Sequence, residues 1–393
     1  MNRTGKRTAV AIACGGTGGH LFPGMAVGRE LVRHGCAVTL LVSPKEVDQL
    51  AVRCVSDMKV ETLPAVGLQG RNYLKFLSGL RKSVREARRL FRKDRPAAVL
   101  SMGGFTAAAP VMAGKLFRAK LFLHESNAVP GRANRMLSPW VHRAFLGFRQ
   151  AADRLKTKRI TISGTPVREQ FQHVVQETCR RVMKLNARRP TVLVMGGSQG
   201  AKAVNDMMMM SMPLVTRVMP ALQYLWLAGG HDVGRVRAFC QEGGYPVVVR
   251  KFLPEMEVAY GAATVAVARS GAASLAEMAA MRVPSILVPL PTAADNHQFH
   301  NAANFEKTGA AKLLQQASAT PEKLVGLLTG LARDEPAREA MKDALDQWHR
   351  RDAAELICER ILTALGRWDG ASEHEASESS FELHKDSLRL VTS

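Results

Sequence analysis

Short apolar runs rich in branched side chains alternate along the chain with amphipathic stretches of helical spacing. In the first half these runs predict strands over 8–14, 37–42, 98–102, 120–123 and 160–163, with a helix over 24–34. The same order begins again beyond residue 190, with strands predicted over 191–195, 224–228, 247–250, 264–268 and 285–288. Strands that alternate with helices favour parallel sheets covered by helices on both faces.

Each half opens with a strand that leads through a glycine-rich turn into a helix. The two turns are GGTGG at 15–19 and GGSQG at 196–200. This repetition predicts an α/β fold of two doubly wound, Rossmann-like domains that face each other across a cleft. We expect an N-terminal domain over 1–166 and a C-terminal domain over 167–344. A last helix, predicted over 337–365, is expected to pack back on the first domain from about residue 345 to 366. The Ser- and Glu-rich residues 367–393 are expected to form a disordered tail.

The net positive charge of the chain arises entirely from its first half. The formal net charge is +21, and residues 1–168 carry 30 basic and 9 acidic side chains. The remaining residues carry 25 of each sign. This segregation indicates an anionic partner for the first half, such as phosphates, a membrane surface or nucleic acid, against the alternative of a merely soluble basic surface. No motif that reads DNA or RNA accompanies the charge, so we expect no nucleic-acid partner.

The cysteine spacing and the hydropathy indicate the cellular compartment in which the protein is expected to work. The six cysteines are scattered and form no C-x-x-C pair, which indicates neither a disulfide framework nor a zinc site and favours a reducing cytosol. No uncharged apolar run approaches the roughly 18 residues that span a bilayer. The opening residues resemble a signal peptide only faintly and predict a first buried strand. Any membrane contact is therefore expected to be peripheral.

The first glycine turn has the properties of an anion site. Glycine allows a ligand to approach the backbone closely, and the following helix offers unpaired N–H groups. The turn lacks the Gly-Lys-Ser/Thr ending of a Walker A loop, and it is a poor dinucleotide fingerprint. Thr17 and His20 at its rim favour a bound ligand over a plain strand-to-helix turn. His20 could accept a proton from a substrate hydroxyl.

The second half contains three polar segments that each follow a strand. Ser198 and the segment 270–274 precede helices, so two helix N-termini are expected to form a diphosphate cradle. Glu277 could accept hydrogen bonds from both ribose hydroxyls of a nucleotide, although a capping box with Ser274 as N-cap fits the same spacing. The third segment, 295–301, contains side-chain amides that suit sugar hydroxyls.

Residues 71–95 contain ten basic and two acidic side chains. Tyr73, Phe76, Leu77 and Leu80 recur among them at helical spacing, which is typical of a basic amphipathic helix on an anionic membrane surface. A core-facing helix with a solvated basic face fits the same pattern.

Seven motifs together resemble the MurG family, bacterial transferases that add N-acetylglucosamine to lipid I in peptidoglycan synthesis. In chain order they are GGTGGHLFPG at 15–24, SMGGFTAAAP at 101–110, HESN at 124–127, GTPVR at 164–168, GGSQGA at 196–201, RSGAASLAE at 269–277 and DNHQFHNA at 295–302. The resemblance covers about residues 8–365 and implies a GT-B fold. It implies that the C-terminal domain binds the UDP-sugar and that the N-terminal domain binds the lipid-linked acceptor.

The resemblance also assigns residues by position. Substrate-binding residues would be Thr17, Gly18, Gly19, Asn127, Arg168, Ser198, Leu253, Ala272, Ala273, Ser274, Leu275, Ala276, Glu277, Gln298 and Asn301. Within this set, Leu253 would present backbone groups to uracil, and Gln298 with Asn301 would read the sugar. Ser126, Thr165, Ser274 and His297 depart from the family pattern by polar exchanges that keep hydrogen-bonding ability.

The expected reaction is one inverting displacement on UDP-N-acetylglucosamine by the 4-hydroxyl of the muramyl sugar of lipid I, at the cytoplasmic face of the bacterial plasma membrane. His20 is the candidate base, with a supporting role as the alternative, and Glu277 supports the ribose. No Asp-x-Asp motif is present, and no metal or other cofactor is expected to be obligatory, because helix N-termini stabilise the leaving diphosphate. A UDP-sugar epimerase of the same fold and a non-enzymatic basic membrane-binding protein remain as alternatives.

Overall fold

The computed structural model describes residues 7–16, 18–45, 48–49, 52, 55–64, 73–172, 174–197, 200–368 and 382–383. The chain divides into two compact units, Met1–Arg168 with Arg350–Ser393, and Glu169–His349. The first segment of the first unit ends at Arg168, close to the expected end of the N-terminal domain at residue 166. Each unit is built around one sheet, and both sheets are of the doubly wound type.

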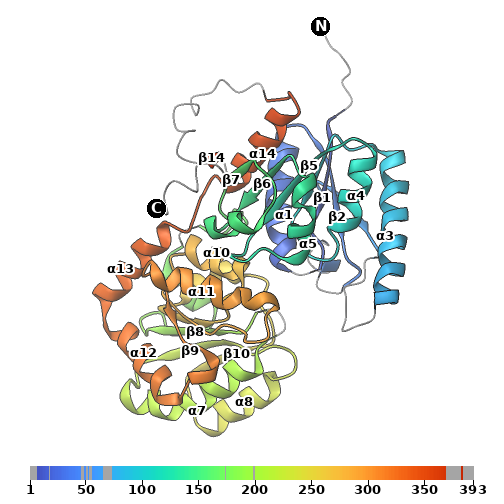
Figure 1. The fold of residues 1–393 in the computed structure, drawn as a ribbon. Helices are drawn as coiled ribbons and strands as arrows, with labels where there is room; N and C mark the ends of the chain where they lie inside the picture. The colour runs from blue at the N-terminus through green and yellow to red at the C-terminus, as the bar shows by residue number, and fades with distance from the viewer. Residues whose placement is uncertain are drawn as a thin grey trace. The chain divides into compact units, whose positions relative to one another are not determined.

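The first unit contains an eight-stranded sheet in the order β14-β7-β6-β5-β4-β1-β2-β3 (Figure 1). Its strands are β1 (Ala9–Ala13), β2 (Ala37–Val42), β3 (Lys59–Thr62), β4 (Ala98–Ser101), β5 (Lys120–Glu125), β6 (Arg143–Leu146), β7 (Ile160–Ile162) and β14 (Glu382–Leu383). Strands β1 to β7 pair in parallel, and β14 pairs antiparallel with β7. The strand order reverses between β1 and β4, which is where open α/β sheets bind their ligands.

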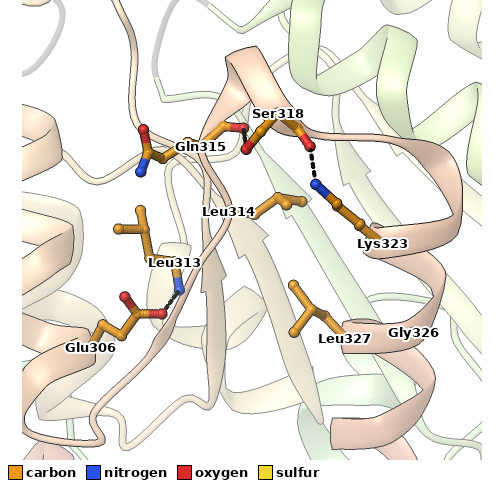
Figure 2. A pocket seen from close by; sticks show the side chains of 8 residues that line it. All are labelled: Glu306, Leu313, Leu314, Gln315, Ser318, Lys323, Gly326 and Leu327. Carbon is orange, nitrogen blue, oxygen red and sulfur yellow. Dashed lines mark hydrogen bonds between the residues drawn. The ribbon is translucent and has the colours of Figure 1, made fainter.

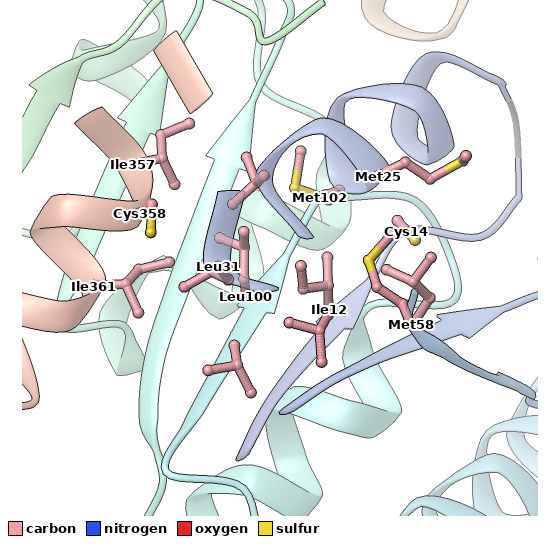
Figure 3. Packing of buried hydrophobic residues seen from close by; sticks show 14 of the residues in the cluster. Ile12, Cys14, Met25, Leu31, Met58, Leu100, Met102, Ile357, Cys358 and Ile361 are labelled. Atoms are coloured by element: carbon pink, nitrogen blue, oxygen red, sulfur yellow. The ribbon is translucent and has the colours of Figure 1, made fainter. Parts of the chain in front are cut away.

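Helices cover both faces of this sheet. They are α1 (Gly18–Arg33), α3 (Tyr73–Lys93), α4 (Ala108–Leu116), α5 (Arg132–Leu137) and α14 (Ala353–Ala364), with the 3-10 turns η2 (Ser138–Trp140) and η3 (Arg149–Arg154). On one face, Leu31 of α1 and Ile361 of α14 pack with Ile12 of β1 (Figure 3). On the other face, Phe91 of α3 packs in the cluster that contains Ala11. Neighbouring residues of β1 therefore enter opposite layers, as the two-residue period of a strand requires.

The second unit contains a six-stranded parallel sheet in the order β10-β9-β8-β11-β12-β13. Its strands are β8 (Thr191–Met195), β9 (Gln223–Leu227), β10 (Val247–Arg250), β11 (Val265–Ala268), β12 (Ser285–Leu287) and β13 (Lys312–Leu313). Its helices are α6 (Gln176–Val182), α7 (Lys202–Val218), α8 (Val233–Glu242), α9 (Met256–Ala262), α10 (Ala272–Ala280), α11 (His297–Lys307), α12 (Pro321–Arg333) and α13 (Glu335–Asp346), with η4 (Ala294–Asn296) and η5 (Gln316–Ser318). The strand order reverses here between β8 and β11.

Every strand that the sequence predicts is present, whereas β3, β6, β13 and β14 were not predicted, and β14 lies inside the expected disordered tail. Strand β3 is partly exposed, with Lys59 and Thr62 at its ends, and therefore has no apolar run that marks it. The helix predicted over 24–34 begins earlier, at Gly18. Glycine and proline in 18–24 suggested a loop, but Pro23 is accommodated inside α1.

The single last helix predicted over 337–365 is wrong, because the chain breaks between α13 and α14. Trp348 stacks on Phe305 with 4.5 Å between ring centroids, and its Nε1 donates to Thr308 Oγ1 at 2.8 Å. These contacts hold the end of α13 on the second unit. Arg350 then donates to Asp352, which is the N-cap of α14. Only α14, and not the chain from 345, packs against α1.

The expected disordered tail begins too early at 367. The Trp368 side chain packs against the core of the first unit, with its ring 5.0 Å from that of His34. Residues 369–381 and 384–393 lie outside the described residues. Among the helices that the structure describes, none combines the length and the hydropathy needed to cross a membrane. The described cysteines, which do not include Cys54, are free and buried.

Candidate active site

The first glycine turn lies at the carboxyl end of β1, at the reversal point of the first sheet. A Cβ on Gly15 would lie 2.3 Å from the backbone nitrogen of Ser43, and Gly16 has a φ of +117°. Both positions therefore require glycine. Thr17 lies outside the described residues. Gly18 and Gly19 are the first two residues of α1, so His20 belongs to the first turn of a helix and not to the rim of a longer loop.

The imidazole of His20 rests against the loop that follows β4. Gly103 and Gly104 in this loop have φ values of +94° and +76°. A Cβ on Gly103 would lie 3.2 Å from His20 Cε1, and one on Gly104 would lie 3.0 Å from His20 Cδ2. The backbone of Gly103 and Gly104 therefore packs directly against the imidazole of His20, and a side chain at either position would displace the imidazole.

His124, at the end of β5, is a buried neutral histidine. Its Nε2 lies 3.1 Å from the carbonyl oxygen of Gly164, which can only accept, so Nε2 carries the proton. Its Nδ1 then accepts from Ser126 Oγ at 3.3 Å. The pKa of His124 is lowered to about 4, chiefly by burial with a smaller contribution from the nearby His20, against the opposing effects of Gly164 and Glu125. His124 therefore stays uncharged at neutral pH and supports the loop.

Glu125 fixes Asn127, and the sequence reasoning assigned it no role. Its Oε1 accepts from the backbone nitrogen of Asn127 at 2.9 Å and from Asn127 Nδ2 at 3.0 Å. Its Oε2 accepts from Gly131 N at 2.9 Å and from Asn134 Nδ2 at 3.0 Å. Asn134 in turn accepts from Ser101 Oγ at 3.3 Å. This buried network joins the end of β4 to Asn127. In the sequence, Glu125 stands after the apolar run of β5 and within the motif HESN at 124–127.

In the second unit, three loops meet at the carboxyl ends of the neighbouring strands β8, β11 and β12. The register pairs Met195 with Ala268 and Ala268 with Leu287, so the residues that follow these strands are adjacent. In the second glycine turn, Gly197 and Gly200 have φ values of +86° and +75°. Ser198 lies outside the described residues. The predicted meeting of two helix N-termini, those of α7 and α10, at one sheet edge is therefore found.

Helix α10 begins with unpaired backbone N–H groups. Its N-cap is Gly271, which has no side chain to accept a hydrogen bond, so the alternative of a capping box with Ser274 as N-cap is wrong. Of the residues assigned to ligand binding, Ala272, Leu275 and Ala276 are buried, whereas Ala273 and Ser274 are partly exposed. Glu277 lies in the second turn, and its Oε2 accepts from the hydroxyl of Tyr260 at 3.2 Å. Tyr260 was not predicted.

Polar side chains brace the turn between β11 and α10. Arg269 is buried and donates to the carbonyls of Val288 and Pro289, both at 2.9 Å, and burial lowers its pKa. Ser270 Oγ donates to the carbonyl of Gln298 at 2.8 Å. Asn301 is fully buried, and its Nδ2 donates to the carbonyl of Ser270 at 3.2 Å. Both residues expected to read the sugar therefore also support this turn.

Two further predicted residues have distinct surroundings. Leu253 follows β10 with its side chain buried, while the adjacent Phe252 is 55% exposed. Arg168 is the last residue of the first segment of the first unit, and its guanidinium carbon lies 4.5 Å from the ring centroid of Phe22 on α1. The structure thus places Arg168 over Phe22, in the second turn of α1.

Helix α3 packs on the core along one part of its length and exposes an apolar side chain along another. Its second half faces the core through Leu90 and Phe91. In its first half the core-facing positions are small, Gly79 and Ser83, whereas Leu77 is 48% exposed. Phe76 and Leu80 are partly exposed, and the side chain of Tyr73 lies outside the described part. The neighbouring α4 exposes Met112 and Leu116, and the exposed Trp140 has Lys115 Nζ 4.2 Å above its ring.

A groove of about 550 Å³ lies at the β13 edge of the second sheet (Figure 2). Its carboxylate, Glu306, accepts from the backbone nitrogen of Leu313 at 2.9 Å, and Lys323 Nζ donates to the carbonyl of Ser318 at 2.9 Å. The two charged side chains of the groove are thus paired with backbone, and none of the predicted site residues lines it. Over the part of the chain that the structure describes, no three His, Cys, Asp or Glu side chains converge on a possible metal site.

Comparison with known proteins identifies the family. The glycosyltransferase family 28 N-terminal domain matches residues 10–146, and the family 28 C-terminal domain matches residues 191–357. The UDP-N-acetylglucosamine–N-acetylmuramyl-(pentapeptide) pyrophosphoryl-undecaprenol N-acetylglucosamine transferase of Xanthomonas euvesicatoria is 35% identical over 92% of this chain and 82% of its own length. The enzyme of the same name from Shewanella amazonensis is 36% identical over 91% of this chain and 97% of its own.

Solved structures agree with this relationship. The crystal structure of Acinetobacter baumannii MurG matches with a TM-score of 0.71 and 26% identity, over 91% of this chain and 100% of that one. A UDP-N-acetylglucosamine 2-epimerase matches with a TM-score of 0.68 but only 14% identity, over 93% and 99% of the two chains, which shows a shared fold alone. The two parallel α/β units are those of the GT-B fold. The chain belongs to glycosyltransferase family 28, and within it to the MurG family of N-acetylglucosamine transferases.

Proposed function

We propose that this protein transfers N-acetylglucosamine from UDP-N-acetylglucosamine to the 4-hydroxyl of the muramyl sugar of lipid I, and so forms lipid II. The observation that carries this proposal is the identity of 31–36% to transferases of this name over 88–96% of the chain. The two glycine turns, each at the reversal point of its sheet, support it, because this is where such sheets bind phosphate-bearing ligands.

The donor is assigned to the second unit. Its diphosphate would lie at the N-termini of α7 and α10, where aligned peptide dipoles and unpaired N–H groups stabilise negative charge. Ser198 and Arg168 would complete the phosphate contacts, and the segment Ala272 to Glu277 would follow the ribose and phosphate. Glu277, whose Oε2 accepts from the Tyr260 hydroxyl, would accept hydrogen bonds from the ribose hydroxyls. Leu253 would meet uracil through its backbone, and Gln298 and Asn301 would contact the sugar.

The acceptor is assigned to the first unit. Its diphosphate would bind at Gly18 and Gly19, and at Thr17, which lies outside the described residues. In the transfer step, an oxygen lone pair of the acceptor 4-hydroxyl forms the bond to the anomeric carbon. The bond from that carbon to the UDP oxygen breaks, and UDP leaves with the electron pair. The hydroxyl proton passes to a ring nitrogen of His20, and Asn127, oriented by Glu125, contacts the donor sugar. Attack from the face opposite UDP inverts the anomeric centre.

Charge stabilisation by helix N-termini makes an obligatory metal unnecessary in this mechanism. We therefore expect turnover to be unchanged by EDTA when no divalent cation is added. A loss of turnover that Mg²⁺ restores would contradict this part of the proposal.

We infer that the protein docks peripherally on the anionic cytoplasmic leaflet through the first half of α3 and the adjacent exposed apolar side chains. Leu77, Phe76 and Leu80 would enter the interface, while Arg81 and Lys82, both exposed, would face anionic headgroups. Sedimentation with vesicles that contain anionic lipid tests this. Leu77→Ser should weaken binding severalfold, whereas Val182→Ser, at a 60% exposed position of the second unit, should not. Equal binding by both variants would refute this docking surface.

The reaction itself is tested by following UDP release from UDP-N-acetylglucosamine with and without a lipid I analogue. A transferase releases UDP and forms the disaccharide only with the analogue. A 2-epimerase would isomerise the donor without it, and a non-enzymatic membrane-binding protein would do neither. His20→Ala should lower turnover far more than donor affinity, and unchanged turnover in that variant would reject His20 as the base.

A further inference from the structure

The first glycine turn rests on a buried carboxylate that belongs to none of the seven motifs. Asp48 lies between β2 and β3 and is fully buried. Its Oδ2 accepts from the backbone nitrogen of Gly16 at 2.6 Å, from Ser43 Oγ at 2.5 Å and from Ser43 N at 3.2 Å. The turn after β1 is thereby tied to the residue that follows β2.

Other side chains hold the same turn at its carbonyl groups. Thr106, fully buried in the loop after β4, donates from Oγ1 to the carbonyl of Gly15 at 2.5 Å. Lys45 Nζ donates to the carbonyl of Gly16 at 3.0 Å and lies 5.0 Å from the ring centroid of Phe105. Side chains that follow β2 and β4 thus bind the two residues that follow β1, Gly15 and Gly16, and restrict the conformation of this turn.

The hydrogen bond to Asp48 also selects which amides of the turn remain for a ligand. An anion at a glycine turn competes for every N–H group that points outward. Because the Asp48 carboxylate already binds the N–H of Gly16, a diphosphate is directed to the amides that follow, at the start of α1.

We propose that Asp48 is a positioning residue for the transfer reaction, which fixes the Gly15–Gly16 turn and thereby the first turn of α1 with His20. Helix α1 begins at Gly18, only two residues after Gly16, so a shift of the turn moves the helix terminus directly. This inference rests on the proposed transfer to lipid I. Misplacement of a reacting group by about 1 Å is enough to reduce turnover about a hundredfold.

The test compares Asp48→Ala with Asp48→Asn and with the control Asp57→Ala, which changes an exposed aspartate of the same unit. Asp48→Ala should lower kcat for a lipid I analogue roughly 10- to 100-fold. It should leave the Kd of UDP-N-acetylglucosamine, measured by calorimetry, within twofold of wild type. Asp48→Asn keeps an oxygen that can replace Oδ2, so it should restore most of the turnover. Asp57→Ala should match wild type throughout.

Hydrogen–deuterium exchange supplies a readout that does not depend on activity. Asp48→Ala should speed exchange in the peptide that contains Gly16, while peptides from β5 and β6 remain as in wild type. If Asp48→Ala does not fold, Thr106→Val, which removes the hydrogen bond on the opposite side of the turn, should show the same split between kcat and donor Kd. Turnover of Asp48→Ala and Thr106→Val equal to that of the control would overturn the proposal. So would uniform exchange across the first unit with loss of donor binding, since that pattern marks a merely structural role. A wild-type protein that transfers no sugar would instead refute the proposed function.

Discussion

Glu125→Gln is the sharpest test of how the first unit holds Asn127. Each oxygen of Glu125 faces two donors, the backbone and side-chain N–H groups of Asn127 at Oε1 and those of Gly131 and Asn134 at Oε2. Glutamine has the same shape but replaces one oxygen by an NH₂ group. In either orientation of the amide, a donor is placed against two donors, so two hydrogen bonds are lost inside a site that is 3% exposed.

The magnitude follows from the charge of the acceptor. A hydrogen bond to a charged group contributes about 1.5–3 kcal/mol, so losing two of them predicts a cost of about 3–6 kcal/mol before relaxation. Relaxation places the expected loss of stability of the first unit at about 3 kcal/mol. The orientation with the NH₂ group toward Asn127 releases that residue directly, and the other orientation frees Gly131 and Asn134 in the segment that follows it, so kcat should fall by roughly tenfold or more.

The assay combines urea unfolding with steady-state transfer to a lipid I analogue. Glu61→Gln is the matched control, because Glu61 is a partly exposed residue of the same unit whose surface ion pair with Lys59, at 2.9 Å, contributes little. Hydrogen–deuterium exchange of β4 and β5 peptides assigns any destabilisation to the first unit. The reasoning is refuted if Glu125→Gln unfolds at the urea concentration of the control and turns over at the control rate.

Three further predictions concern other parts of the site. Gly104→Ala should lower kcat roughly tenfold or more while leaving the Kd of the donor unchanged by calorimetry, because its φ of +76° and a Cβ 3.0 Å from His20 Cδ2 displace the imidazole. Tyr260→Phe removes the 3.2 Å hydrogen bond to Glu277 and should raise the KM for UDP-N-acetylglucosamine about fivefold with kcat nearly unchanged in initial-rate assays. His124 has a folded pKa of about 4 against about 6.5 in the unfolded chain, so the unfolded state binds more protons between these values. The first unit should therefore lose about 1.4 kcal/mol of stability per pH unit as the pH falls from about 6.5 to 4, a slope that urea unfolding should find absent in His124→Gln.

The order of strands and the position of the site could be predicted because both depend on local patterns. Buried parallel strands are continuous apolar runs, and the glycine turns follow two of them directly. The rule that parallel strands end at one sheet edge then brings Gly196, Ser270 and Gln298 together without any knowledge of their contacts. Strand β13 was not predicted because a strand of two residues has no detectable periodicity. The break before α14 was not predicted because it depends on the stacking of Trp348 on Phe305.

The supporting residues could not be predicted for a different reason. Asp48 contacts Gly16 across 32 positions, and Tyr260 contacts Glu277 from a different helix. Such pairs depend on register and helix packing, which a single sequence does not specify. What the sequence does contain is a carboxylate directly at the end of a buried strand, as at Glu125, the last residue of β5. A charge at such a place is retained only with partners, so it indicates a buried network without naming its members.

The separation of charge between the two halves matches two different ways of binding an anion. The donor diphosphate is assigned to a half of the chain with equal numbers of acidic and basic residues, where helix N-termini act only within about a turn of the helix. A dissolved nucleotide-sugar reaches the site by diffusion, so short-range contacts inside the site are sufficient to bind it.

The proposed acceptor is fixed in an anionic surface that the protein must first reach. The whole excess of +21 lies in residues 1–168, where net charge acts over a Debye length of about 8 Å and guides the approach. An epimerase, which shares the fold but takes only a dissolved nucleotide-sugar, would have no use for that asymmetry. The charge distribution therefore favours a membrane-bound acceptor where the fold alone does not.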